Sequence, residues 1–263
     1  MFPLVKRPVF SMIHDLSFVL PAYNEAANVQ ESVRQGRLAL ERLVEIGAIG
    51  GWEIVVVDDG SVDGTGGLVE ALGDERVRLV QHPVNRGYGA ALRSGFDAAR
   101  CSLVFFTDAD LQFDAGEIDR LLPWINQYDI VCGYRSTRKD PWVRRANAAA
   151  WGMALYGAFG LDVEDVNCAF KLFRRDVLSD MEIESNGAFV NAEILIKSIQ
   201  RGHSIKQVPV SHFARLAGEQ TGADPRVVLR AFKELARFYR LSKDTDGPWT
   251  SSDRTASLAN PMR

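Results

Sequence analysis

Two aspartates separated by one small residue form the sharpest chemical feature of the sequence. Asp108-Ala109-Asp110 follows directly after Leu103–Thr107, an apolar run with the length of a buried strand. Two carboxylates at this spacing can approach one divalent cation together. Oxygen ligands with few protein donors suit Mg²⁺ or Mn²⁺, which fill their other coordination positions with water and substrate phosphates. We therefore expect Asp108 and Asp110 to hold Mg²⁺ or Mn²⁺, although such a pair could also merely close the strand and face solvent.

Polar loops also follow three other predicted strands. Pro21–Glu25 comes after the first strand, Asp58–Ser61 after the second and Asn85–Gly89 after the third. Ligands of open parallel sheets bind beyond the carboxyl ends of the strands. Together with the two aspartates, these loops predict one polar binding edge. Taken alone, Asp58–Ser61 would also suit a plain turn.

Apolar runs of strand length alternate with longer segments of helical period. The predicted strands are Leu16–Pro21, Trp52–Asp58, Val77–Gln81, Leu103–Thr107, Ile130–Gly133 and Cys168–Phe173, with an extended segment at His203–Phe213. The predicted helices are Asn28–Ile46, Gly64–Leu72, Gly89–Ala99, Arg144–Phe159, Asn191–Ile199 and Asp224–Leu241. Because the strands are apolar on both faces, the pattern predicts an α/β fold with a largely parallel sheet covered by helices.

Three polar residues carry helix-start signals. Asp114 with Glu117 three residues later has the spacing of a capping box. Asn191 is expected to cap the helix that follows it. Asp224 is expected to cap a helix whose first residue is Pro225.

The composition excludes several classes of protein. The chain has 263 residues, and 46% of them are hydrophobic, which excludes disorder of the whole chain. Its 31 Lys and Arg balance 34 Asp and Glu, so it lacks the basic excess of a general nucleic-acid-binding protein. Its three cysteines form no C-x-x-C pair, which indicates reduced thiols in a cytosolic compartment. No apolar run reaches the length of a membrane span. We divide the chain into an N-terminal extension (1–14), one domain (15–242) and a disordered tail (243–263).

Two other phosphate-binding classes fit the sequence poorly. Gly87-Tyr88-Gly89 before a helix suggests a dinucleotide fingerprint, but Leu92 stands where the third glycine belongs. A phosphatase of the D-x-D-x-T type would need Thr at the position of Gln112.

The order of four motifs identifies a family resemblance. VLPAYNEAANV, VVVDDGSVDGT, NRGYGAALRSGF and FFTDADLQFD together resemble family 2 glycosyltransferases of the GT-A fold, over Leu16–Arg240. The segments GYR, DVNCAFKLFRR and VPVSHFAR resemble the polyprenyl-phosphate branch, which includes dolichol-phosphate mannose synthase-like enzymes. The resemblance implies a Rossmann-like, mostly parallel sheet with a C-terminal amphipathic helix. It also implies inverting transfer of a hexose from a nucleotide-sugar to a lipid phosphate.

The resemblance assigns a donor side to the predicted edge. Residues that match the nucleotide-sugar site are Pro21, Ala22, Tyr23, Glu25, Asp58, Asp59, Asp108, Ala109, Asp110 and Arg215. Among them, Asp58 would contact the base, Asp108 and Asp110 would bind the metal and diphosphate, and Arg215 would belong to a loop that closes on the donor. Gln112 would complete or support the metal shell.

The chemistry of the acceptor decides which side chains must bind it. A lipid phosphate is already ionised and needs cations rather than a general base, and Arg135, Arg145 and Lys171 could provide them. A sugar hydroxyl would need a general base, which Asp165 could be. Otherwise Asp165 would orient a neighbouring arginine, which is the role we favour.

The helix predicted at Asp224–Leu241 is basic and amphipathic, with Arg226, Arg230, Lys233 and Arg237 among its cations. Such a helix suits an anionic membrane surface, or it packs on the core with a solvated basic face. The sequence thus predicts an enzyme peripheral on the cytoplasmic membrane face. Its expected partners are a GDP- or UDP-linked mannose or glucose, a polyprenyl phosphate and a separate membrane protein that anchors it or receives the product. The alternatives are transfer to a sugar hydroxyl in polysaccharide or glycolipid synthesis and a non-catalytic nucleotide-sugar-binding regulator.

Overall fold

The structure, a computed structural model, describes residues 14–136, 142–179, 181–215 and 225–244. Within residues 142–148, 225–230 and 241–244 it describes the helical backbone alone. The expected extension at 1–14, apart from its last residue, and the tail from 245 onwards lie outside these ranges. Residues 243–244, assigned above to the tail, are helical.

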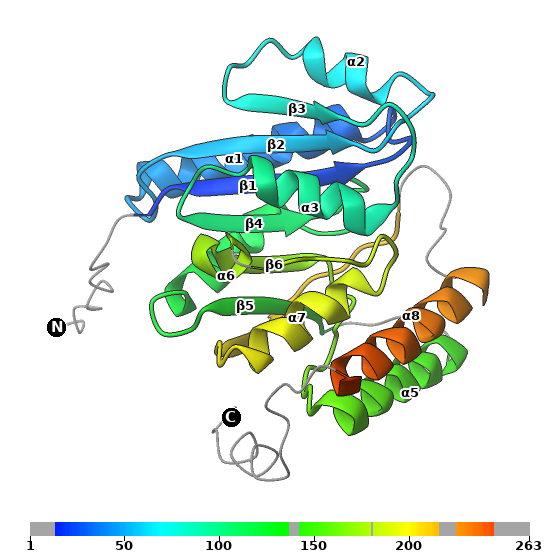
Figure 1. The fold of residues 1–263 in the computed structure, drawn as a ribbon. Coiled ribbons are helices and arrows are strands. Elements are labelled where there is room, and N and C mark those ends of the chain that lie inside the picture. The colour runs from blue at the N-terminus through cyan, green and yellow to red at the C-terminus, as the bar shows by residue number, and fades with distance from the viewer. Residues whose placement is uncertain (1–13, 137–141, 180, 216–224, 245–263) are drawn as a thin grey trace, which may run out of the picture.

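A sheet of seven strands forms the centre of the described part of the chain, in the order β3-β2-β1-β4-β6-β5-β7 (Figure 1). The strands are β1 (Leu16–Ala22), β2 (Trp52–Asp58), β3 (Val77–Gln81), β4 (Leu103–Thr107), β5 (Ile130–Arg135), β6 (Phe170–Arg174) and β7 (Ile205–Val210). Only β6 among them runs antiparallel to its neighbours, β4 and β5. The predicted mostly parallel sheet is confirmed.

Helices cover both faces of this sheet. They are α1 (Val29–Glu45), α2 (Thr65–Glu70), α3 (Tyr88–Ala98), α4 (Ile118–Leu121), α5 (Trp142–Phe159), α6 (Arg175–Ser179), α7 (Val190–Gln200) and α8 (Pro225–Asp244), with single turns at Ala115–Glu117 and Leu122–Trp124. Figure 1 shows α1 behind the sheet and α3 and α7 in front of it. The short helix α6 was not predicted.

The central strands are buried on both sides, which explains their continuous apolar runs. In β2, Ile54 and Val56 belong to one hydrophobic cluster with α1, while Val55 and Val57 belong to a second cluster with α3 and α7. Successive side chains of a strand point to opposite faces, so one apolar run supplies both clusters.

Of the predicted helix starts, the cap at Asp114 is confirmed, whereas its capping box with Glu117 and the cap at Asn191 are wrong. The side chain of Asp114 accepts a hydrogen bond from the Gly116 amide at 2.8 Å, as expected of a cap. Glu117 completes no capping box, because its carboxylate instead binds Ser211, which follows β7. Asn191 lies inside α7 and not before it, and its side chain accepts a hydrogen bond from Lys171. The predicted cap Asp224 lies outside the described residues.

Helices α5 and α8 lie side by side at one end of the sheet (Figure 1). Their aromatic rings pack edge to face. The ring centroids of Trp151 and Phe232 lie 4.9 Å apart, and those of Phe159 and Phe238 lie 5.7 Å apart. Leu235 of α8 is buried, whereas Lys233 and Arg237 are exposed. Helix α8 therefore packs on the core by one face and carries cations on the other.

Among the described residues, no helix combines the length and the hydrophobicity needed to cross a bilayer. All three cysteines are free thiols, and burial raises the pKa of Cys132 to about 11 and that of Cys168 to about 12. These two thiols are inert at neutral pH.

Candidate functional site

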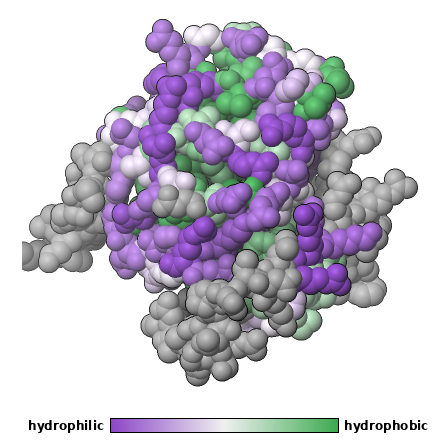
Figure 2. Space-filling model, viewed as in Figure 1, coloured by the Kyte–Doolittle hydropathy of each residue, from purple (hydrophilic) through white to green (hydrophobic). Residues whose placement is uncertain are grey.

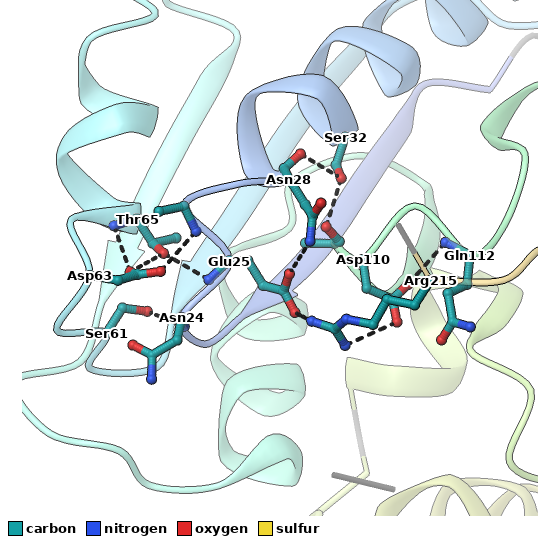
Figure 3. Close-up of polar contacts among 12 residues, drawn as sticks. Asn24, Glu25, Asn28, Ser32, Ser61, Asp63, Thr65, Asp110, Gln112 and Arg215 are labelled. Atoms are coloured by element: carbon teal, nitrogen blue, oxygen red, sulfur yellow. Dashed lines mark hydrogen bonds and ion pairs between the residues drawn. The ribbon is translucent and has the colours of Figure 1, made fainter. Parts of the chain in front are cut away.

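The loops after β1 and β2 are joined by hydrogen bonds (Figure 3). The amide of Asn24 donates to Ser61 Oγ, that of Glu25 to Thr65 Oγ1 and that of Ala26 to Asp63 Oδ2, each at 2.9 Å. Because three successive amides of one loop are bound by side chains of the other, the backbone of Glu25 is fixed at the edge of the sheet.

Glu25 points from this loop towards the end of β4 (Figure 3). Its carboxylate accepts a hydrogen bond from Asn28 Nδ2 at 2.7 Å and pairs with Arg215. Burial raises the pKa of Glu25, although Asn28 and Arg215 oppose that effect. An ionised Glu25 therefore depends on its cationic neighbour.

Asp108 and Asp110 stand at the end of β4, as predicted. Asp108 Oδ1 accepts a hydrogen bond from the Tyr88 hydroxyl at 2.8 Å. Asp110 Oδ1 accepts one from the amide of Gln112 at 3.1 Å, which is helped by the left-handed backbone of Leu111 (φ 62°). Local contacts thus hold one oxygen of each carboxylate.

The two carboxylates form an electrostatically unfavourable pair. Burial, and next the negative charge of Asp110, raise the pKa of Asp108 to about 7. Burial also raises the pKa of Asp110, which is only 7% exposed. A bound cation would favour the ionised form of both groups.

The donor set fits a hard divalent ion. Within the described residues, no group of three or more His, Cys, Asp and Glu side chains is placed to hold a metal. A cation at Asp108 and Asp110 would therefore take its remaining ligands from water or from substrate phosphates, which is the usual mode of Mg²⁺.

Arg215 lies between Glu25 and Asp110 (Figure 3). Its Nη1 is 3.5 Å from Asp110 Oδ2, and its Nη2 pairs with Glu25. One guanidinium from the segment after β7 thus bridges carboxylates that follow β1 and β4.

The segment that delivers Arg215 is anchored to the loop after β4. Ser211 binds both oxygens of Glu117 at 2.7 Å through its amide and its hydroxyl. Phe213 exchanges two hydrogen bonds with Gln112: its amide donates to Gln112 O at 2.8 Å, and Gln112 Nε2 donates to its carbonyl at 3.1 Å. Gln112 therefore positions this segment, and its place in a metal shell stays a prediction.

Asp58 and Asp59, at the end of β2, are both buried and bound by protein groups. Asp58 is fully buried and accepts hydrogen bonds from the Ser61 amide and from Gln81 Nε2, both at 3.0 Å. Asp59 is buried too, and it accepts from the amides of residues 86 and 87 at 2.9 and 2.8 Å and contacts His82 at 2.6 Å. Both carboxylates hold loops in place, and their contact with a nucleotide stays a prediction.

The other predicted donor-side residues line the same edge to different degrees. Pro21, Ala22 and Ala109 are buried, and the carbonyl of Ala109 accepts a hydrogen bond from Ser32 at 2.8 Å. Tyr23 is 48% exposed, which leaves its ring available to a ligand.

Arg135 and Asp165, both predicted to lie on the acceptor side, form a bidentate ion pair. Asp165 Oδ2 lies 2.6 Å from Arg135 Nε, and Oδ1 lies 2.9 Å from Nη2. They border a small cavity of about 40 Å³ with Trp151 and Gly152. An open hollow of about 470 Å³, lined by Gly152, Met153, Tyr156 and Leu161 among others, adjoins it at Gly152.

Lys171 was predicted to contact an acceptor phosphate, and the structure contradicts this. Its side chain is buried, and Nζ donates to the carbonyls of Val166 and Cys168 and to Asn191 Oδ1. Three oxygens use the three donors of an ammonium group, so none remains for a phosphate. The side chain of Arg145 lies outside the described residues.

Comparison with known proteins places this site in context. A family model described as glycosyl transferase family 2 matches residues 17–181. The chain is 32% identical over 209 residues to an undecaprenyl-phosphate 4-deoxy-4-formamido-L-arabinose transferase of Aeromonas hydrophila, covering 78% of this chain and 61% of that protein. A protein of the same name from Pseudomonas fluorescens is 31% identical over 225 residues, covering 82% and 62%. The chain thus spans about three fifths of the length of these relatives.

Solved structures share the fold. Glucosyl-3-phosphoglycerate synthase of Mycobacterium tuberculosis, in complex with Mn²⁺, UDP and glucosyl-3-phosphoglycerate, has a TM-score of 0.67 and 24% identity, covering 85% of this chain and 79% of that one. Mannosyl-3-phosphoglycerate synthase of Rubrobacter xylanophilus has a TM-score of 0.68 and 19% identity, covering 90% and 78%. The predicted GT-A architecture is therefore confirmed.

Proposed function

Because the chain belongs to glycosyl transferase family 2, we propose that it transfers a hexose, mannose or glucose, from a nucleotide-sugar to a polyprenyl phosphate with inversion. The observation that carries this proposal is the place of Asp108 and Asp110 at the end of β4, opposite Glu25 and Arg215. The names of the relatives support a polyprenyl phosphate as the acceptor.

On the donor side, the chain provides ligands for a divalent cation and one fixed positive charge. Mg²⁺ or Mn²⁺ at Asp108 and Asp110 would supply Lewis-acid stabilisation of the departing nucleoside diphosphate. Arg215 already lies beside Asp110 and can form charge-assisted hydrogen bonds to the same diphosphate. Tyr23 is exposed on the adjoining loop and can border the base or ribose of GDP or UDP.

On the acceptor side, Arg135 binds the phosphate and Asp165 fixes its guanidinium. The bidentate pair holds Nε and Nη2, and Arg135 is partly exposed beside the small cavity. A phosphate monoester carries a charge of roughly −1.5 to −2 at pH 7, so it attacks without a general base. Arg145 is a second candidate cation from α5.

We further propose that the protein works at the cytoplasmic face of a membrane. Helix α8 exposes Lys233 and Arg237, and α5 exposes Met153 and Tyr156 beside the open hollow. The face seen in Figure 2 is largely hydrophilic, and the described part of α8 belongs to this hydrophilic surface. Basic and apolar groups together suit an anionic lipid surface. A membrane protein could complete the anchoring.

Nucleotide binding tests the donor half of this proposal. We would measure thermal stabilisation of the full chain by UDP and by GDP, each with and without Mn²⁺, for the wild type and for Asp110→Asn. Metal-dependent stabilisation of the wild type by one nucleotide, reduced in the variant, is expected and would identify the base. No stabilisation by any nucleotide would contradict the proposal.

A further inference from the structure

We propose that Tyr88 is a positioning residue that holds the Asp108 carboxylate in the orientation needed for metal binding, and that Asn191, itself bound by Lys171, holds Tyr88. This inference rests on the proposed function, since it concerns the same metal site. It assigns a purpose to the Gly87-Tyr88-Gly89 motif, which no part of the proposed reaction has used.

The four side chains form a directional series of hydrogen bonds. Lys171 Nζ donates to Asn191 Oδ1 at 3.2 Å, Asn191 hydrogen-bonds the Tyr88 hydroxyl, and Tyr88 donates to Asp108 Oδ1 at 2.8 Å. An ammonium group has donors only, so Asn191 must present its oxygen to Lys171 and its amide nitrogen to Tyr88. The Tyr88 proton is then directed to Asp108.

The series is rigid at its inner end. Lys171 is only 1% exposed, and it is also bound by the carbonyls of Val166 and Cys168. Asn191 is buried within α7. Lys171 lies close enough to Asp108 for its positive charge to oppose the rise in the pKa of that carboxyl. The inner members of the network, Lys171 and Asn191, are thus buried, and Tyr88 is half-buried between them and Asp108.

The two glycines allow Tyr88 to reach this position. A Cβ atom at Gly89 would lie 2.0 Å from the Ser185 carbonyl oxygen, and one at Gly87 would lie 2.4 Å from that of Asn186. Gly87 also has a φ of 99°, which side-chain-bearing residues rarely adopt. The backbone before α7 therefore packs directly against the start of α3, and the Gly89 amide donates to Asn186 O at 2.9 Å.

This packing has a consequence for Asp108. With one oxygen fixed by Tyr88, the carboxylate keeps its other oxygen for a cation. Groups that orient a metal ligand from behind usually change metal affinity by about 10- to 100-fold when they are removed. Tyr88 is expected to act in this way without touching metal or substrate.

The test compares Tyr88→Phe with the wild type. Free Mn²⁺ would be quantified by electron paramagnetic resonance during titration of the full chain, in the presence of the nucleotide that stabilises it. We expect Mn²⁺ to bind Tyr88→Phe about 10-fold more weakly, while binding of the nucleotide without metal is unchanged. Asn191→Ala is a second variant that should weaken Mn²⁺ binding in the same direction.

Tyr128→Phe is the matched control, because Tyr128 is partly buried beside Trp124 near the start of β5, at the opposite edge of the sheet. It should bind Mn²⁺ like the wild type. Wild-type Mn²⁺ affinity in both Tyr88→Phe and Asn191→Ala would overturn this inference and leave the proposed function standing. A wild-type chain that binds no Mn²⁺ with any nucleotide would contradict the proposed function itself.

Discussion

The guanidinium of Arg215 lies 3.5 Å from the carboxylate of Asp110, although the two residues come from segments far apart in the chain. The same group pairs with Glu25, so a single side chain joins the loops after β1 and β4. The positive charge at the proposed donor site therefore comes from the segment after β7, beyond the residues that match the family model.

Replacing Arg215 by Gln should weaken nucleotide binding. A hydrogen bond to a charged group contributes roughly 1.5–3 kcal/mol, so we expect a loss of affinity of about 10-fold or more for the stabilising nucleoside diphosphate in the presence of Mn²⁺. Isothermal titration calorimetry would measure this. Arg42→Gln, at an exposed position of α1, is the control and should bind as the wild type does. Equal affinities for Arg215→Gln and the wild type would remove Arg215 from the donor site.

Asp165→Asn separates the two chemistries of the acceptor side. If Asp165 orients Arg135, the amide keeps part of the contact, and the KM for polyprenyl phosphate should rise by about 10-fold with a small change in kcat. A general base would behave differently, because its loss typically lowers kcat by about 10²–10⁴-fold. Steady-state kinetics with varied acceptor distinguishes these results. Loss of turnover with intact binding of both substrates would favour a sugar hydroxyl as acceptor.

The pKa of Asp108 predicts how the metal-free protein responds to pH. Because the folded-state pKa of about 7 lies above the ordinary value of 3.8, this group stabilises the fold when protonated. That contribution is complete below about pH 4 and is lost as the pH rises through about 7.

Asp108→Asn should therefore be more stable than the wild type at pH 8 without metal. One unit of pKa shift corresponds to about 1.4 kcal/mol, so we expect a gain in unfolding free energy of at least about 1 kcal/mol. The difference should shrink towards pH 4. Urea unfolding at both pH values, in the presence of EDTA, measures it. If Asp108→Asn were less stable than the wild type at pH 8, this would contradict the claim that the ionised pair of Asp108 and Asp110 destabilises the fold.

Two glycine substitutions test the packing at the start of α3. Gly89→Ala should lower the free energy of unfolding by about 2 kcal/mol or more, because the new methyl group meets a backbone oxygen. Gly67→Ala, in α2, has nothing within 4 Å and should instead stabilise the fold by about 0.5–1 kcal/mol. Chemical denaturation of both variants checks the contrast. If Gly89→Ala and Gly67→Ala had similar free energies of unfolding, the start of α3 would not pack against the backbone of residues 185–186.

Regular elements could be predicted from the sequence because their signals are local. The ranges Trp52–Asp58, Val77–Gln81 and Leu103–Thr107 agree with the structure to the residue. Strand β6 begins two residues later than predicted, and its antiparallel pairing depends on contacts that no local pattern records. The short helix α6 follows β6 without a break and was missed for the same reason.

The site was predictable only where one motif supplies all of it. Asp108 and Asp110 stand together as their spacing indicated. The partners of Glu117 and Arg215, and the Asn191 partner of Lys171, come from distant segments, so residue type alone could not separate a loop anchor from a ligand. A buried lysine and a surface lysine look the same in a sequence. The lone Tyr88 between two glycines was the one available signal of the network behind Asp108.

Transfer of sugar to lipid tests the central claim most directly. The full chain would be incubated with undecaprenyl phosphate in mixed micelles, Mn²⁺ and labelled UDP- or GDP-hexoses, and lipid-extractable label would be counted. We predict that a lipid phosphate carrying the labelled hexose forms only when metal is present. It should not form with the Asp110→Asn variant. Metal-dependent binding of the nucleotide-sugar without transfer to lipid phosphate from any donor would contradict the account.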